Sequence, residues 1–300
     1  MSVPLVVDTD IGSDVDDALA LALAIRHPDL ELRAVSTVSS QPDARARLAR
    51  RLLDLAGATD VPVAVGASAP GDDRNVIGAE HLALLAPTSD LAPPKDAITL
   101  LVALDADVSL ATIGQQTNAA AAAGRDPALP HRIAGLTVMG GSFAPFEAAD
   151  GHTYGAERDW NLVLDPSSAV TSLSAGWRVR YVPIDVTFGT VLTRAHVERL
   201  RAGDELCRLL ADLVDAWAAR MFPASASTDV ACYLHDPLTV ACVTDCEFIE
   251  AARLAVTVMV DARGVPHTVV DPTEGHQADV VRTVDAPAFA DWLVETLLRG

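Results

Sequence analysis

Residues 8–17 read Asp8-Thr9-Asp10-Ile11-Gly12-Ser13-Asp14-Val15-Asp16-Asp17, and this stretch decides the fold that the chain can adopt. The apolar run before it, residues 3–7, predicts a buried parallel strand, and the alternating Ala and Leu of residues 18–23 predict a buried helix. Gly12 permits a tight turn between the two. The acidic residues therefore lie at the carboxyl end of a strand, which is where open α/β sheets bind their ligands.

The five carboxylates of this stretch point to a bound cation. Neighbouring carboxylates repel one another and raise one another's pKa, whereas a divalent metal allows several of them to stay ionised together. The alternative is an ordinary acidic turn that is exposed to solvent.

Strand-like and helix-like segments alternate along the rest of the chain, without a linker that is typical of a domain boundary. We expect strands at residues 30–38, 61–65, 108–113, 135–139 and 178–182, and a pair of strands at 254–260 and 267–270. We expect helices at 43–56, from 117 onward, at 204–221 and at 287–298. The pattern predicts an α/β fold with one domain, residues 1–300, built on an open, mostly parallel sheet that is flanked by helices. Two irregular polar stretches, 71–94 and 143–159, are long enough to be active-site loops.

Composition narrows the class of partner. The chain has 300 residues, and 50% of them are hydrophobic, which is enough for a large core. Its 41 acidic and 22 basic residues give a formal net charge of −19. Such a chain repels nucleic-acid phosphates and anionic membranes, so a small neutral or cationic molecule is the favoured partner.

The sequence also predicts a cytoplasmic location. Its start lacks the basic region and the long apolar run of a signal peptide, and no apolar stretch reaches membrane-spanning length. Four cysteines are too few for a disulfide framework in a chain of this size. Cys232, His235, Cys242 and Cys246 mimic zinc-ligand spacing, but their apolar surroundings favour free, buried cysteines.

Five segments, in one order along the chain, resemble the inosine-uridine nucleoside hydrolase family. The first is residues 8–17, in a form with two extra residues before the Asp-Asp pair. The others are Ile113-Gly114-Gln115-Gln116-Thr117-Asn118, Val138-Met139-Gly140-Gly141, Asp159-Trp160-Asn161 followed by Asp165-Pro166, and Leu234-His235-Asp236-Pro237. Each segment alone is typical of a helix cap or a turn, but five such segments in the family's order indicate the family much more strongly than any one of them. The resemblance implies a Rossmann-like nucleoside hydrolase fold.

The resemblance implies calcium-dependent hydrolysis of the N-glycosidic bond of a purine or pyrimidine riboside, or of a related N-glycoside. Asp10, Asp17, the main-chain carbonyl of Thr117 and Asp236 would bind the metal, and such hard oxygen ligands suit Ca²⁺. A metal-bound water would be the nucleophile, Asp10 would be its base, and C1′ would be inverted. His235 would protonate the departing base, or would make only a structural hydrogen bond.

The same resemblance assigns the contacts with the substrate. Asp16 would bind ribose hydroxyls, and Met139, Asp159, Trp160 and Asn161 would line the sugar site, with a carboxylate and an amide at the 5′ end. It also implies a homodimer or a homotetramer.

Three expected sugar contacts depart from the family's pattern. Gln41 lies near the place of a Gly-Asn pair, His152 near the place of an Asn, and Asp159 in the place of a Glu. We therefore expect intact metal chemistry, altered sugar recognition and weak turnover of common nucleosides. Asp14 either replaces Asp16 in the motif or caps the helix, and His81 is a further candidate for a contact with the base.

Two alternatives remain open. A catalytically weak or specialised calcium-binding homologue, acting on an unusual glycoside, would carry the same motifs. A haloacid dehalogenase-type phosphatase would use Asp8 as its nucleophile and Asp10 as its acid. Its phosphate would need a lysine, and Lys95 is the only lysine of the chain.

Overall fold

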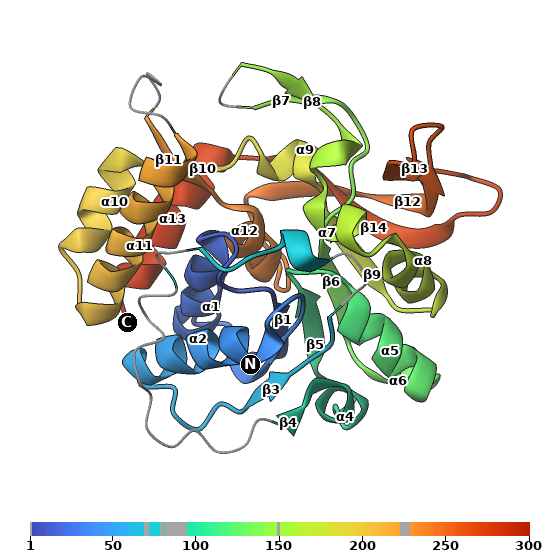
Figure 1. Cartoon of the computed structure of the whole chain (residues 1–300), viewed down its shortest axis with the longest axis horizontal. Helices are drawn as coiled ribbons and strands as arrows, with labels where there is room; N and C mark the ends of the chain where they lie inside the picture. The colour runs from blue at the N-terminus through green and yellow to red at the C-terminus, as the bar shows by residue number, and fades with distance from the viewer. Residues whose placement is uncertain (1, 69–71, 79–80, 82–94, 149–150, 223–228) are drawn as a thin grey trace.

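Ten strands form one sheet through the centre of the molecule (Figure 1). The computed structural model describes residues 2–68, 72–78, 81, 95–148, 151–222 and 229–300. The strand order is β13-β12-β14-β9-β6-β5-β1-β2-β3-β4. In chain order these strands are β1 (Val3–Thr9), β2 (Leu30–Thr37), β3 (Val63–Val65), β4 (Lys95–Asp96), β5 (Ser109–Thr112), β6 (Gly135–Met139), β9 (Val179–Val182), β12 (Ile249–Val260), β13 (Pro266–Val270) and β14 (His276–Val284). Two small antiparallel sheets pair β7 (Phe146–Glu147) with β8 (Thr153–Tyr154), and β10 (Val191–Thr193) with β11 (Val230–Tyr233).

The sheet is parallel from β4 to β14, and β12 runs antiparallel to both of its neighbours. Strand β1 lies between β2 and β5, with Asp8 opposite Ser36 on one side and Thr112 on the other. The carboxyl ends of these three strands therefore meet at one edge of the sheet, directly before the acidic turn.

Helices cover both faces of the sheet (Figure 1). Strand β1 shows the division, because Leu5 and Val7 belong to one hydrophobic core and Val6 belongs to the other. The helices are α1 (Asp16–Arg26), α2 (Pro42–Leu55), α4 (Ala97–Val102), α5 (Thr117–Arg125), α6 (Leu129–Arg132), α7 (Trp160–Leu164), α8 (Pro166–Ser174), α9 (Ile184–Thr187), α10 (Arg194–Arg201), α11 (Glu205–Met221), α12 (His235–Ala241) and α13 (Ala286–Leu298), with short 3₁₀ turns η1 (Asp72–Arg74) and η3 (Ala156–Arg158).

Helix α1 is the buried helix of the first core. Its residues 16–24 are all buried, so it is apolar around its whole circumference after the two aspartates of its first turn. It packs against α2, α12 and α13, which enclose it on the side away from the sheet. The acidic first turn of α1 is consequently fixed next to the first turn of α12.

The expected α/β class and its mostly parallel sheet are confirmed, and the pair 254–260 and 267–270 is confirmed as antiparallel β12 and β13. The sequence pattern missed β14, whose ends are polar and exposed although Ala278, Val280 and Val281 are buried. The stretch 143–159 contains the β7–β8 hairpin and η3, and most of 71–94 lies outside the described residues. Within the part of the chain that is described, no helix is both long and apolar enough to cross a lipid bilayer.

Candidate active site

Asp16, Asp17 and Asp236 form a compact carboxylate group. One oxygen from each lies within 4.8 Å of the others, and within the described residues no other group of three or more His, Cys, Asp or Glu does this. The first turn of α1 supplies two of them and the first turn of α12 supplies the third. The Asp236 backbone N–H donates to Asp16 Oδ2 over 3.1 Å, and the Thr9 hydroxyl donates to Asp17 Oδ1.

The electrostatics of this carboxylate group favour a divalent cation. Burial raises the pKa of all three carboxyl groups well above the usual range, and repulsion from neighbouring aspartates, Asp10 among them, raises it further. Their side chains are nearly inaccessible, at 2%, 2% and 5% exposure. Several hard oxygen donors in one buried place suit Ca²⁺ or a similar hard cation, whose charge would allow them to ionise together.

Asp10 lies beside this carboxylate group and has its own set of partners. Its Oδ2 accepts a hydrogen bond of 2.6 Å from Asn75 Nδ2, and its main-chain carbonyl accepts one from Arg45. Burial raises the pKa of Asp10, while the Arg45 charge and the Asn75 hydrogen bond oppose that rise. Asp10 also repels the charges of Asp16, Asp17 and Asp236, which places it within electrostatic reach of the three-carboxylate group.

Asp8 lies beneath the site and is inaccessible. It accepts hydrogen bonds from Ser36 Oγ at 2.5 Å and from Asn118 Nδ2 at 2.8 Å. Burial raises its pKa to about 7. A carboxylate with 0% exposure and two buried donors is not placed as a phosphatase nucleophile, so the dehalogenase-type alternative loses its support.

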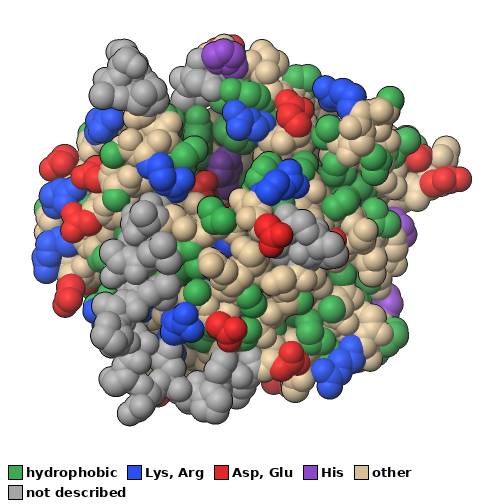
Figure 2. Space-filling view, viewed as in Figure 1, with side chains coloured by type: hydrophobic (Ala, Val, Ile, Leu, Met, Phe, Trp, Pro, Cys, Tyr) green, Lys and Arg blue, Asp and Glu red, His purple; other side chains and the backbone are tan. Residues whose placement is uncertain are grey.

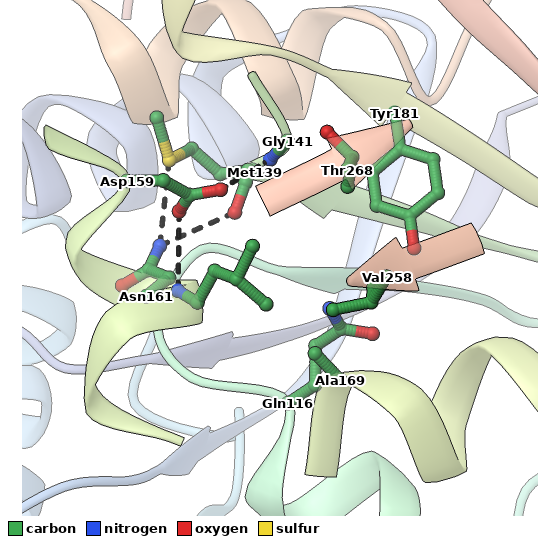
Figure 3. A pocket seen from close by; sticks show the side chains of 11 residues that line it. Gln116, Met139, Gly141, Asp159, Asn161, Ala169, Tyr181, Val258 and Thr268 are labelled. Atoms are coloured by element: carbon green, nitrogen blue, oxygen red, sulfur yellow. Dashed lines mark hydrogen bonds between the residues drawn. The ribbon is translucent and has the colours of Figure 1, made fainter. Parts of the chain in front are cut away.

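The strand ends beside β1 carry the next predicted residues. Thr117 begins α5 directly after β5, and its hydroxyl donates to Asp165 Oδ2 at 2.7 Å. Asn161 joins the ends of β5 and β6, because its amide donates to the carbonyls of Ile113 at 3.0 Å and of Met139 at 3.2 Å. Figure 3 shows the contact between Asn161 and Met139 at the edge of a pocket.

Asp159 faces away from solvent and into the protein. Its carboxylate accepts the backbone N–H of Gly141 at 2.6 Å and that of Leu162 at 3.1 Å, so it caps α7. Asp159 and Asn161 lie on one side of the pocket in Figure 3, and Tyr181 and Thr268 lie on the other. Burial raises the pKa of Asp159 to about 6.

His235 is held through one ring nitrogen. Its Nδ1 lies 2.6 Å from the hydroxyl of Thr187, the last residue of α9. Phe188 and Tyr233 pack around the ring, with centroids 4.7 and 5.5 Å away. These apolar surroundings lower the pKa of His235 to about 4. Figure 2 shows a hollow on this face of the molecule in which histidine and acidic side chains are visible.

The remaining predicted contacts lie further out or deeper. Gln41 is exposed before α2, with a positive φ of 58°, and His152 is exposed beside the β7–β8 hairpin. Trp160 is 44% exposed, and the guanidinium of Arg74 lies 5.3 Å from the centre of its ring. His81 is buried.

Asp14 and the cysteines have separate surroundings. Asp14 is partly exposed, and its Oδ1 accepts the Val15 N–H at 2.8 Å. Cys232 and Cys242 are buried free thiols, and no Cys or His belongs to the three-carboxylate group, which is the one such group in the described parts of the chain. The zinc alternative therefore gains nothing from the structure.

Sequence reasoning missed Arg45, Asn75 and Thr187. A signal existed for Arg45, because helical spacing puts it on the same face of α2 as Leu48 and Ala49, which are both buried. A charged residue on a buried helix face needs partners. Asn75 lies in an irregular segment, where no periodicity could reveal that it reaches Asp10.

Known proteins resemble this chain over nearly its whole length. The model of the family described as inosine-uridine preferring nucleoside hydrolase matches residues 5–291. The pyrimidine-specific ribonucleoside hydrolase RihA of Enterobacter sp. (strain 638) is 31% identical over 100% of this chain and 99% of its own length. RihA of Salmonella typhimurium is also 31% identical, over 99% of each chain.

Solved structures show the same architecture. A plant nucleoside hydrolase, the PpNRh1 enzyme, has a TM-score of 0.84 and 25% identity over 100% of both chains. A purine-preferring ribonucleoside hydrolase from Gardnerella vaginalis has a TM-score of 0.81 and 23% identity over 99% of this chain and 98% of that one.

Proposed function

Because the chain belongs to the inosine-uridine preferring nucleoside hydrolase family, and so to the N-glycosyl hydrolases, we propose that it hydrolyses ribonucleosides with a divalent metal, most suitably Ca²⁺, at the Asp16–Asp17–Asp236 group. The observation that carries the proposal is this buried three-carboxylate group beside Asp10, at the carboxyl ends of the central strands. The names of the two RihA relatives described above make pyrimidine ribonucleosides the first substrates to test.

Asp10, Asp17, Asp236 and the Thr117 carbonyl remain our predicted ligands. Because Asp16 lies in the same group of carboxylates, we propose it as a further ligand, and its contact with ribose hydroxyls also remains a prediction. The bound cation would supply positive charge that acidifies and orients a water. Asp10, whose Oδ2 accepts a hydrogen bond from Asn75, would be the group that accepts the proton of this water. The water oxygen would then form a bond to C1′ while the C1′–N bond breaks, and the electron pair of that bond would leave with the base.

His235 acts on the departing base. Because its pKa is about 4, the ring is neutral at pH 7. If the Thr187 hydroxyl donates to Nδ1, the ring proton is on Nε2, from which it can be offered to the base as a hydrogen bond. This assignment gives His235 the role of a hydrogen-bond donor to the leaving group.

The residues that depart from the family's sequence pattern are those predicted to contact the sugar. We propose that Met139, Trp160 and Asn161 lie along the sugar, and that Asp159 acts by fixing the turn at Gly141. Gln41 and His152 are exposed and remain predicted contacts. A homodimer or homotetramer in the cytoplasm also remains a prediction, which light scattering on a size-exclusion column and cell fractionation would test.

Release of free base is the direct test. Purified protein with millimolar calcium would be assayed on uridine, cytidine, inosine and p-nitrophenyl riboside. A parallel assay on p-nitrophenyl phosphate with magnesium would test the phosphatase alternative. We expect base release that EDTA abolishes and calcium restores, and a kcat lowered by about 10³-fold in Asp10→Asn. Absence of base release from every riboside, or full activity of Asp10→Asn, would overturn the proposal.

A further inference from the structure

Arg45 is a completely buried arginine next to the acidic turn. Its exposure is 0%, although it lies on an otherwise amphipathic surface helix, α2. Burying a guanidinium is unfavourable unless its N–H groups find acceptors in good geometry. The acceptors around Arg45 therefore show what the side chain is placed to do.

The guanidinium joins three segments that are distant in sequence. Nη1 donates to the carbonyls of Asp10 and, at 3.1 Å, of Ile11, and to the Ser13 hydroxyl at 2.8 Å. Nε donates to the carbonyl of Ser40 at 2.7 Å. Nη2 donates to the carbonyl of Asn75 at 2.6 Å.

The same three segments meet again through Asn75. Its side-chain amide donates to Asp10 Oδ2 at 2.6 Å and to Ser39 Oγ at 2.8 Å. Ser40 Oγ donates to the Asn75 carbonyl at 2.6 Å, beside the Arg45 contact. Arg45 thus holds the backbone of Asp10 and the backbone of Asn75, and Asn75 in turn holds the carboxylate of Asp10.

We infer that Arg45 is a positioning residue for Asp10. Through its hydrogen bonds to the Asp10–Ser13 turn and to Asn75, Arg45 fixes the Asp10 carboxylate in one orientation beside the three-carboxylate group. The planar guanidinium is required, because its N–H groups reach acceptors in three directions from one rigid group. The ammonium of a lysine is instead a single charged centre at the end of a flexible side chain. The inference rests on the proposed function only for the catalytic part of its readout.

The chain offers a matched control one and a half turns along the same helix. Arg50 also donates to backbone carbonyls, of Ala58 at 2.9 Å and of Val61 at 2.7 Å, but these lie after the end of α2 and away from the acid group. Arg50→Met therefore removes backbone contacts of the same kind, together with the ion pair between Arg50 and Asp54, without touching Asp10 or Asn75.

The test compares Arg45→Lys, Arg45→Met, Asn75→Ala and Arg50→Met with the wild type. Near-ultraviolet circular dichroism reports folding, calorimetry with calcium alone reports the calcium Kd, and riboside kinetics separate kcat from KM. In Arg45→Lys we expect a native spectrum, a calcium Kd about tenfold higher and a kcat about 100-fold lower, with KM changed less than about threefold. Arg50→Met should leave the calcium Kd and kcat unchanged.

The coupling between the two positions completes the test. Asn75→Ala should reproduce the loss of kcat, and Arg45→Lys/Asn75→Ala should lose no more than the worse single variant, because both act on one carboxylate. If Arg45→Met does not fold, Arg45→Lys and Asn75→Ala still decide. Three outcomes would overturn the inference. Arg45→Lys could keep the wild-type calcium Kd and kcat, or the double variant could lose kcat by the product of the two single losses. Arg50→Met could also lose calcium affinity and kcat as much as Arg45→Lys does. Absence of riboside hydrolysis by the wild type would overturn the proposed function instead, and the calcium Kd would still test Arg45.

Discussion

The length of a single side chain, or one of its hydrogen bonds, determines what that side chain can do at this site. At position 159 an aspartate is short enough to accept the Gly141 and Leu162 N–H groups from inside the protein. Its two backbone donors partly offset the burial that raises its pKa to about 6. The consequence is a pH dependence of stability that belongs to this residue.

Asp159→Asn should remove that pH dependence. Because the folded-state pKa of Asp159 lies above its unfolded value of 3.8, the folded chain binds the proton more tightly, and its stabilising contribution is present below about pH 4 and lost as the pH rises through 6. The change amounts to about 3 kcal/mol. Urea unfolding of both proteins between pH 4.5 and 7.5 should show the wild type falling relative to Asp159→Asn as the pH rises. Parallel curves would contradict the assignment.

Thr187→Val should affect the leaving group. Without its hydroxyl, the His235 Nδ1 loses its 2.6 Å partner and the ring tautomer is no longer fixed. We expect kcat to fall about tenfold on uridine, and much less on p-nitrophenyl riboside, whose phenolate leaves without a proton. Thr190→Val is the matched control, because Thr190 is equally buried and its hydroxyl bonds only the Val186 carbonyl at 3.5 Å among the hydrogen bonds described. Equal losses on both substrates would remove His235 from a role at the leaving group.

At the level of elements, the ends of β2 and β3 and the start of α5 pack closely against one another near the three-carboxylate group. A Cβ at Gly66, directly after β3, would lie 2.0 Å from the Thr37 carbonyl oxygen and 2.3 Å from Asn118 Nδ2. Asn118 Nδ2 also donates to Thr37 at 2.9 Å and to Asp8 at 2.8 Å. Glycine at position 66 therefore allows β2, β3 and α5 to meet under Asp8.

Gly66→Ala should destabilise the fold by about 1–3 kcal/mol, because the added methyl would displace both the Thr37 backbone carbonyl and the hydrogen-bonded Asn118 amide. Gly124→Ala is the comparison: it lies in α5 with open space around its Cβ position, and should stabilise by about 0.5–1 kcal/mol. Chemical denaturation of both variants at pH 7 checks the opposite signs. A stability of Gly66→Ala equal to that of the wild type would show that the packing can relax.

The sequence predicted the elements whose residues carry a local pattern. Apolar runs located β1 and β6, and the acidic turn located Asp16 and Asp17 at the start of a helix. It did not predict β14, since polar ends obscure a short buried centre. It also could not reveal that Asn75 reaches Asp10, because that contact joins residues 65 positions apart and depends on a loop conformation rather than on periodicity.

On the scale of the whole molecule, the net charge of −19 and the buried three-carboxylate group lead us to expect that a bound cation stabilises the fold. Calcium at 100 times its Kd should stabilise the wild type by about 2.7 kcal/mol. Asp236→Asn should abolish this gain while the protein still folds, and Asp60→Asn, an exposed aspartate, should retain it. Thermal unfolding with and without calcium measures the difference. A full calcium gain in Asp236→Asn would contradict the ligand assignment.

The three carboxylates come from distant parts of the chain, since Asp16 and Asp17 belong to α1 and Asp236, 220 positions after Asp16, belongs to α12. During synthesis, the early carboxylates emerge from the ribosome long before their third partner exists. A product that terminates before residue 236 has the repelling pair without the third ligand, and lacks α12, which packs on α1. Metal binding at this group would therefore stabilise only chains that extend past residue 236.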